Sequence, residues 1–185
     1  EITDWIPVER ERKNGKIVEA APRCVDFFVP PPALASYGMT NVVSFDMEDP
    51  TAKLGGALVL GAADIVYANA DSLVLAQRDY RYDAGFLQKE QTLLHLFELD
   101  AARTSYGASG IVPGHVLNQF SIDVQGDVVR LATQQSIWQS FVELVPLAND
   151  LDDVPGASAR TQTDSRVITL RASGRSLERL DMTPP

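Results

Sequence analysis

The feature that most constrains the fold is a short unit that the sequence uses three times. Each copy is a polar turn, an apolar strand, and a second strand that ends in an acidic or proline turn. The first strands of the copies are Asp71–Ala76 (DSLVLA), Gly126–Ala132 (GDVVRLA) and Asp164–Leu170 (DSRVITL). Such repetition indicates modules that bury their apolar faces against one another.

The second strands of the copies set the period of the repeat. Leu94 and Ile137 are 43 residues apart, and Ile137 and Leu177 are 40 residues apart. The blades of a β-propeller run at about 40–50 residues, with four strands each. The sequence therefore predicts an all-β fold, a partial or small β-propeller of four-stranded antiparallel blades, with about four blades in 185 residues.

We divide the chain into two parts on this basis. Residues 1–40 form a lead-in segment with short strands and a proline-rich loop, still part of the propeller, and residues 41–185 form the blades. Because each blade packs on its neighbours, about four blades leave open edges, and self-association through these edges is a further expectation.

Most of the expected elements are strands, because helical periodicity is scarce. The predicted strands include Trp5–Val8, Arg23–Val29, Asn41–Met47, Gly55–Leu60, Thr92–Leu99, Ala102–Ala108 and Ile137–Leu147. Predicted hairpins join Asp64–Ala68 to Ser72–Gln77 and Arg166–Ala172 to Ser176–Met182, and predicted loops cover Glu9–Lys16, Arg78–Glu90 and Asn149–Thr163. Ser136–Leu147 also fits a helical stripe, but its aromatic and β-branched residues and its place in the repeat favour a strand.

The segment Tyr106–Gln134 holds the strongest turn signals. Pro and Gly in Val112–Gly114 predict a turn, and Gln125–Gly126 predicts a hairpin between Val116–Val124 and Asp127–Thr133. We expect six apolar side chains to be buried: Phe97, Leu117, Phe120, Ile122, Val129 and Leu131. Asn118 and Gln119 should then bond to backbone, with Asn118 holding the Val112–Gly114 turn or a loop of a neighbouring blade.

The sequence of this segment resembles that of a known protein family. YGASGIVPGHVLNQFSIDVQGDVVRLAT is similar to the most distinctive part of bacterial secreted proteins with a C-terminal β-propeller domain. The strand TLLHLF at Thr92–Phe97 and stretches back to Cys24 also resemble that family, whereas the similarity weakens after Trp138. The resemblance implies a propeller fold and a secreted or cell-envelope location, and it implies no catalytic residues.

Composition excludes several classes of protein. The net charge of −9 and the isoelectric point near 4.6 argue against nucleic-acid binding, which relies on clustered Lys and Arg. The sequence contains no run of about 18 apolar residues, so no transmembrane helix is expected. The opening EITDWIPVERERKNGK is charged and lacks the apolar segment of a signal peptide. If the protein is exported, we therefore expect this sequence to begin after its signal peptide. The lone Cys24 cannot form an internal disulfide.

Few residues carry the pattern of a chemical site. Two His and one Cys are too few for zinc, and we predict no cofactor or metal, with Ca²⁺ at Asp150, Asp152 and Asp153 or at Asp46–Asp49 as the alternative. His95, in mid-strand, is expected to be a hydrogen-bonded interior residue. The candidate ligand-binding residues are His115 and Asn118 beside the predicted turn, and Tyr80, Tyr82 and Tyr106, which suit a sugar or peptide surface.

Two functions remain open from the sequence. The first is a secreted or cell-envelope propeller that acts as a binding or scaffold module for a protein or glycan ligand. The alternative is a propeller hydrolase or lyase that acts on an extracellular polysaccharide through paired carboxylates. The absence of a recognisable catalytic pattern favours the first.

Overall fold

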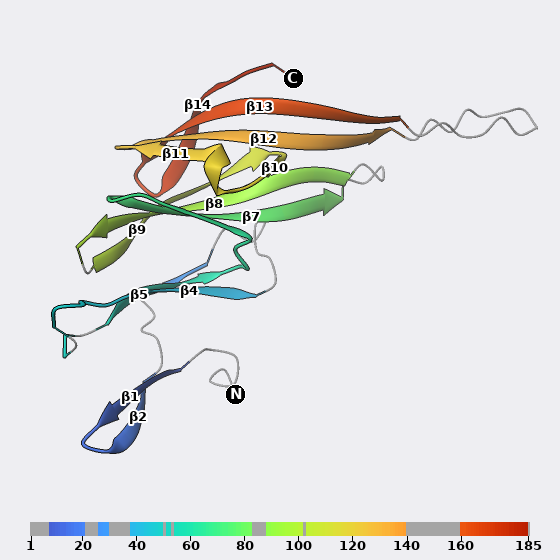
Figure 1. Ribbon diagram of the computed structural model, residues 1–185. Helices are drawn as coiled ribbons and strands as arrows, with labels where there is room; N and C mark the ends of the chain where they lie inside the picture. Colours follow the sequence, from blue (N-terminus) through green and yellow to red (C-terminus); the bar gives the residue numbers. More distant parts are fainter. Residues whose placement is uncertain are drawn as a thin grey trace, which may run out of the picture.

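The computed structural model describes residues 8–20, 26–29, 38–49, 51–52, 54–82, 88–101, 103–139 and 160–184. Within these residues the structure is built of strands and contains no α-helix, which confirms the all-β prediction (Figure 1). The strands are β1 Glu9–Lys13, β2 Lys16–Ala20, β3 Phe27–Phe28, β4 Met39–Ser44, β5 Gly55–Leu60, β6 Ile65–Ala68, β7 Ser72–Tyr82, β8 Gln88–Asp100, β9 Arg103–Pro113, β10 His115–Val116, β11 Ile122–Gln125, β12 Val128–Gln139, β13 Arg160–Ser173 and β14 Ser176–Met182.

Two four-stranded antiparallel meanders form the largest sheet. In the first meander, β6, β7, β8 and β9 follow one another, each antiparallel to the next. In the second, β10 and β11 pair with successive segments of β12, like two halves of one strand, and β13 and β14 follow. The meanders join where Ser176 of β14 pairs in parallel with Ser109 of β9. Both meanders are four-stranded and antiparallel, as predicted for the blades. Two copies of the repeat, Gly126–Ala132 and Asp164–Leu170, pair with each other as β12 and β13 within the second meander, so a meander does not correspond to one copy of the repeat.

The sheet comes close to closing on itself at its other end. There β6 faces β11, and side chains bridge the two strands in place of a backbone ladder. Asn69 Nδ2 donates to the Val124 carbonyl at 3.0 Å, and the Val124 amide donates to the Tyr67 hydroxyl at 3.4 Å. The result is a flattened, barrel-like arrangement with the two meanders face to face.

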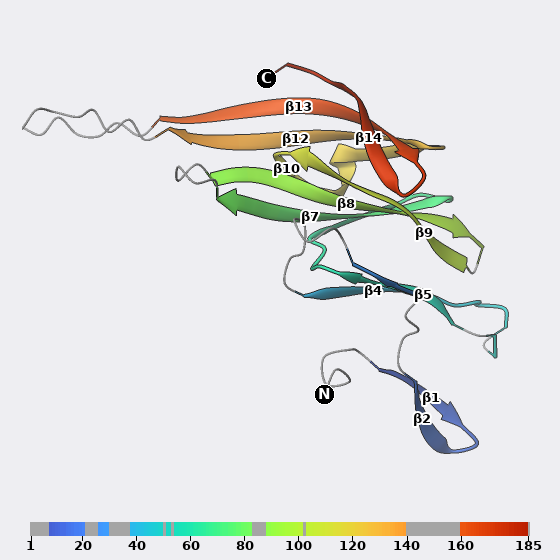
Figure 2. The same ribbon diagram turned by 180° about the vertical axis from the view of Figure 1, so that it is seen from behind.

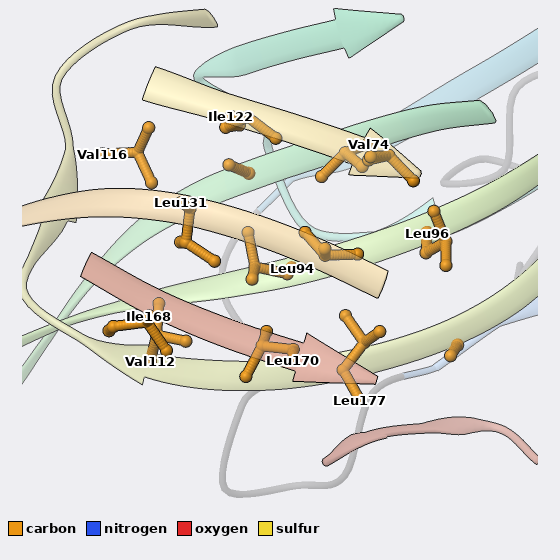
Figure 3. Close-up of a cluster of buried hydrophobic side chains, with 14 residues drawn as sticks. Val74, Leu94, Leu96, Val112, Val116, Ile122, Leu131, Ile168, Leu170 and Leu177 are labelled. Atoms are coloured by element: carbon orange, nitrogen blue, oxygen red, sulfur yellow. The ribbon is translucent and has the colours of Figure 1, made fainter. Parts of the chain in front are cut away.

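The main apolar core lies between the two meanders (Figure 3). Val74, Leu94 and Leu96 come from the first meander, and Leu131 and Leu170 from the second. A second core, on the other face of the first meander, contains Leu75 and Phe97 and packs against the sheet of β3, β5 and β4. The first meander is therefore buried on both faces.

The remaining strands form two smaller sheets. In one, β5 lies between β3, which is parallel to it, and β4, which is antiparallel. In the other, β1 and β2 form a hairpin around Asn14–Gly15, both with positive φ. Figures 1 and 2 place the three-stranded sheet between this hairpin and the first meander. The boundary between residues 1–40 and 41–185 stays a prediction.

An aromatic and histidine cluster joins β8 and β9 to β3. The Tyr106 hydroxyl and His95 Nδ1 are hydrogen-bonded at 2.8 Å, while the Tyr106 ring stacks on Phe28 at 4.1 Å and meets Phe97 edge-on at 5.2 Å. A bulge at Gly107 turns Tyr106 to this face and Ala108 to the other. His95 is thus a hydrogen-bonded interior residue, as predicted, and burial lowers the pKa of His95 from 6.5 to about 4.

Two predicted loops are wrong in the structure. The stretch Glu9–Lys16 forms β1 and the start of β2, and most of Arg78–Glu90 belongs to β7 and β8. In the second case polar side chains pair across the ladder, as when Gln91 Nε2 donates to Asp79 Oδ2 at 2.7 Å. Such pairs let polar residues extend a strand that their composition alone assigns to a loop.

The predicted strand Val116–Val124 is also wrong as a continuous element. It breaks after β10 into a 3₁₀ turn, Gln119–Ser121, before β11 resumes the pairing. Leu117 and Phe120 were predicted to be buried, but they are 58% and 88% exposed because the turn lifts them off the core. Phe97, Ile122, Val129 and Leu131 are buried as predicted.

Several predictions lie outside the described residues. They are most of the strand Trp5–Val8, the first part of Arg23–Val29 with Cys24, most of Ile137–Leu147 and most of the loop Asn149–Thr163.

The contrast between Phe97 and Phe120 gives a test of this core. Phe97→Ala should lower the free energy of unfolding by roughly 3–5 kcal/mol, because the ring is fully buried against β3 and β5. Phe120→Ala, the matched control, should change it by less than about 0.5 kcal/mol. Urea titrations of both variants measure these values, and equal losses would contradict the packing described.

The buried imidazole of His95 predicts a pH dependence of stability. Its folded pKa lies below its unfolded value, so the unfolded chain takes up a proton first and stability falls between pH 6.5 and about 4. The loss should reach about 3 kcal/mol relative to a His95→Gln variant. The free energy of unfolding of both proteins is measured by urea titration at several pH values in this range. If it falls equally with pH in both, His95 does not titrate as its burial requires.

Candidate functional site

A cavity of about 620 Å³ opens where the end of the first meander meets β10. Its size falls in the range of about 300–1,000 Å³ that small-molecule sites occupy in proteins. Its wall is apolar on one side and polar on the other: Ile65, Ala76, Val116 and Leu117, against Asp64, Arg78, Tyr80, Thr92 and His115. We call it the β7–β10 cavity. It brings together two of the predicted site residues, Tyr80 and His115.

A buried carboxylate organises the polar side of this cavity. Glu90 is only 4% exposed, and its Oε1 forms an ion pair with the Arg78 guanidinium. Its Oε2 lies 3.0 Å from His115 Nδ1, an ion-pair distance at which the two atoms do not meet hydrogen-bond geometry. One acid on β8 thus pairs with a cation on β7 and lies beside an imidazole on β10, and both of these side chains line the cavity.

Arg78 also joins the aromatic wall. Its guanidinium carbon lies 5.0 Å from the centre of the Tyr80 ring, a cation–π contact. The backbone amide of Arg78 donates to Asp64 Oδ2 at 2.8 Å, which ties the middle of β7 to the residue that precedes β6. Tyr80 is 42% exposed, so its ring remains open to a bound molecule.

A turn at Gly114 positions His115. The Thr92 hydroxyl donates to the Gly114 carbonyl at 2.7 Å, and the Gly114 amide donates to the Glu90 carbonyl at 2.9 Å. Gly114 has φ +78°, and a Cβ there would lie 2.7 Å from the Gln134 carbonyl oxygen, so only glycine fits. β8 therefore holds this turn through both its backbone and its side chains.

The role predicted for Asn118 in that turn is wrong. Asn118 is exposed, and its Oδ1 accepts a hydrogen bond from the Phe120 amide at 2.9 Å. It acts as the N-cap of the 3₁₀ turn, a local use of a side chain that suits Asn better than burial. Asn118 and Gln119 lie on the surface next to Leu117, which lines the cavity.

The other two predicted residues are not brought into the cavity by the described structure. Tyr106 lies on the opposite face of the first meander, among Phe28, His95 and Phe97. Burial raises its pKa, against the opposing effects of a Ser109 hydrogen bond and the charge of Arg175. Tyr82 ends β7, and its side chain lies outside what the structure describes.

Sequence reasoning missed Glu90 and Arg78, because the stretch that contains them reads as a polar loop. The signal that identifies them is strand register: with β7 and β8 paired, Tyr80 lies opposite Glu90 and Arg78 opposite Thr92. An acid and a base placed diagonally on one face of a ladder are within reach of each other.

Of the two acidic segments predicted as alternative Ca²⁺ sites, Asp46–Asp49 lies within the described residues. Asp46 Oδ1 accepts the Glu48 amide at 2.8 Å, and Asp49 Oδ1 accepts the Thr51 amide at 2.9 Å, so both carboxylates brace a turn. Across the described part of the chain, no three His, Cys, Asp or Glu side chains are grouped to hold a metal ion. Asp150, Asp152 and Asp153 lie outside that part.

The Arg78–Glu90 pair predicts a coupled effect on stability. Arg78→Ala should lower the free energy of unfolding by roughly 3 kcal/mol, because it leaves a buried carboxylate without its cation. Adding Glu90→Gln to this variant should recover part of the loss, since the amide carries no charge. Urea titrations of the two single variants and the double variant measure the coupling, and strictly additive losses would mean that the pair contributes nothing.

Comparison with known proteins supports the fold rather than a specific activity. No curated protein and no solved structure matches the chain. Within the described residues, no helix is long and apolar enough to cross a membrane. A family model described as a β-propeller domain matches residues 1–181. This match covers nearly the whole chain and agrees with its four-stranded antiparallel units, so the chain belongs to the β-propeller domain family.

Proposed function

We propose that this chain is a binding module that works outside the cytoplasm, secreted or in the cell envelope, and that the β7–β10 cavity receives its ligand. The location rests on the resemblance of residues Cys24–Thr133 to bacterial secreted propeller proteins. The site rests on one observation: buried Glu90 pairs with Arg78 and lies 3.0 Å from His115, and both of these side chains line a cavity that also presents Tyr80.

The wall of the cavity suits a ligand with both apolar and hydrogen-bonding surfaces. Ile65, Val116 and Leu117 provide an apolar side, and the Tyr80 ring provides a flat surface on which a sugar or an aromatic side chain packs. Asp64, Arg78 and His115 provide acceptors and donors. A glycan or a segment of another protein has this combination of surfaces.

A polysaccharide hydrolase or lyase is not favoured by this arrangement. Such chemistry needs a pair of carboxyl groups that flank the bond to be cleaved. Glu90 is buried and paired with Arg78, and Asp64 accepts the Arg78 amide at the edge of the cavity. Both carboxylates therefore serve the geometry of the wall.

The test is a binding screen with variants of the cavity. The chain is applied to an array of neutral and acidic cell-wall oligosaccharides and to an array of extracellular peptides. Tyr80→Ala and His115→Ala should weaken any binding by at least about tenfold, because both side chains line the cavity. Arg130→Ala, an exposed arginine on β12, is the control and should bind like the wild type. Binding that survives both cavity changes would move the ligand site elsewhere.

A further inference from the structure

Strand β4 and the residues that follow it to Met47 present apolar side chains that are exposed in the described structure. From Met39 to Met47 the burial alternates, and every second residue points outward. Four of these outward residues are apolar: Met39, Val43, Phe45 and Met47, the last of them 83% exposed. We call them the β4 stripe. The even-numbered residues of the same stretch are partly buried, and Val42 packs on the core of the adjacent sheet.

A hollow and a group of acids continue this surface. Phe45, Met47, Ala52 and Leu54 line a hollow of about 270 Å³ together with Asp46 and Asp49. Glu48 is exposed beside it. The surface is thus apolar in the middle and negatively charged at one end, and contiguous apolar residues with a polar rim mark a site of protein contact.

The hairpin of β1 and β2 has the complementary character. Glu9–Ala20 carries four Lys and Arg against three Glu, in a chain whose net charge is −9. Arg12 and Lys16 are exposed, whereas Arg10 pairs with Glu19 across the hairpin at 2.8 Å. The apolar side chains of Val8, Ile17 and Val18 are exposed as well. The basic hairpin and the acidic end of the β4 stripe would attract each other, and both contribute apolar area.

The hairpin also needs a partner for its own stability. An isolated two-stranded hairpin is marginally stable in water, because it cannot bury enough apolar surface. Among the described strands, β1 and β2 pair only with each other. The three-stranded sheet likewise has β4 as an edge strand, with β5 on one side only.

We propose that the β1–β2 hairpin of one copy of this chain docks on the β4 stripe of a second copy. The second copy is the occupant because, in a single chain, Ile17, Val18 and the β4 stripe all remain exposed. The exchange is reciprocal: each chain supplies one hairpin and one stripe, so the contact closes as a symmetric dimer. The contact lies on the far side of the three-stranded sheet from the first meander, away from the β7–β10 cavity (Figures 1 and 2).

Sedimentation velocity of the whole chain, from micromolar to roughly 100 µM, tests the dimer. The wild type should shift from monomer to dimer over this range. Ile17→Ser on the hairpin and Met47→Ser on the stripe should each weaken the association at least about tenfold. Phe120→Ser, at the most exposed large apolar residue outside the contact, should leave it unchanged.

Charge reversal separates docking from non-specific adhesion. Arg12→Glu and Glu48→Arg should each weaken the dimer, and the double variant should recover much of the loss, because the attraction is restored with opposite signs. Matching circular dichroism spectra and urea midpoints would show that the variants are folded. A wild type that stays monomeric throughout, or single variants that associate as the wild type does, overturns the proposal.

Discussion

The burial of the first meander on both faces is the constraint on which the rest of the structure depends. Its strands must supply apolar side chains to two cores at once, as Val74 and Leu75 do on neighbouring positions of β7. In a regular strand, side chains two positions apart point to the same face of the sheet, so they contribute to the same core. The bulge at Gly107 solves this locally, because it lets Tyr106 and Ala108, two positions apart, face opposite cores.

The polar residue His95 enters this two-faced sheet with only part of its hydrogen-bonding capacity satisfied. His95 lies in the same buried strand as Leu94 and Leu96, and its hydrogen bond to Tyr106 satisfies one of its two ring nitrogens. The other, Nε2, is buried without a partner. Because a buried imidazole without a full set of partners is stable only in its neutral form, burial sets the low pKa of His95. The burial that fixes His95 in place therefore also makes the fold sensitive to acid.

The sequence predicts those parts of the fold that local chemistry decides. Glycine turns with positive φ, at Gly126 and Gly174, mark the hairpins of the second meander, and both hairpins form as expected. The wrong predictions arise where contacts distant in sequence decide. Asp79 and Gln91 extend β7 and β8 by pairing across the ladder, which composition cannot reveal. Leu117 and Phe120 have the pattern of a buried strand, yet the Asn118 cap turns the chain away from the core.

The same distinction applies to the candidate site. Tyr80 and His115 are recognisable because a tyrosine in a polar stretch and a histidine after a Pro-Gly turn are unusual placements for core residues. Glu90 is not recognisable, since its importance comes from register and burial. A buried ion pair stabilises a fold only weakly, because the loss of hydration offsets most of the attraction between the charges. Its main effect here is geometric: the pair holds an arginine at the cavity wall, and the backbone carbonyl of the same glutamate accepts from the Gly114 amide in the turn that positions His115. An acid that pairs with a side chain and binds the turn through its backbone beside an open cavity supports the proposal that this cavity binds a ligand.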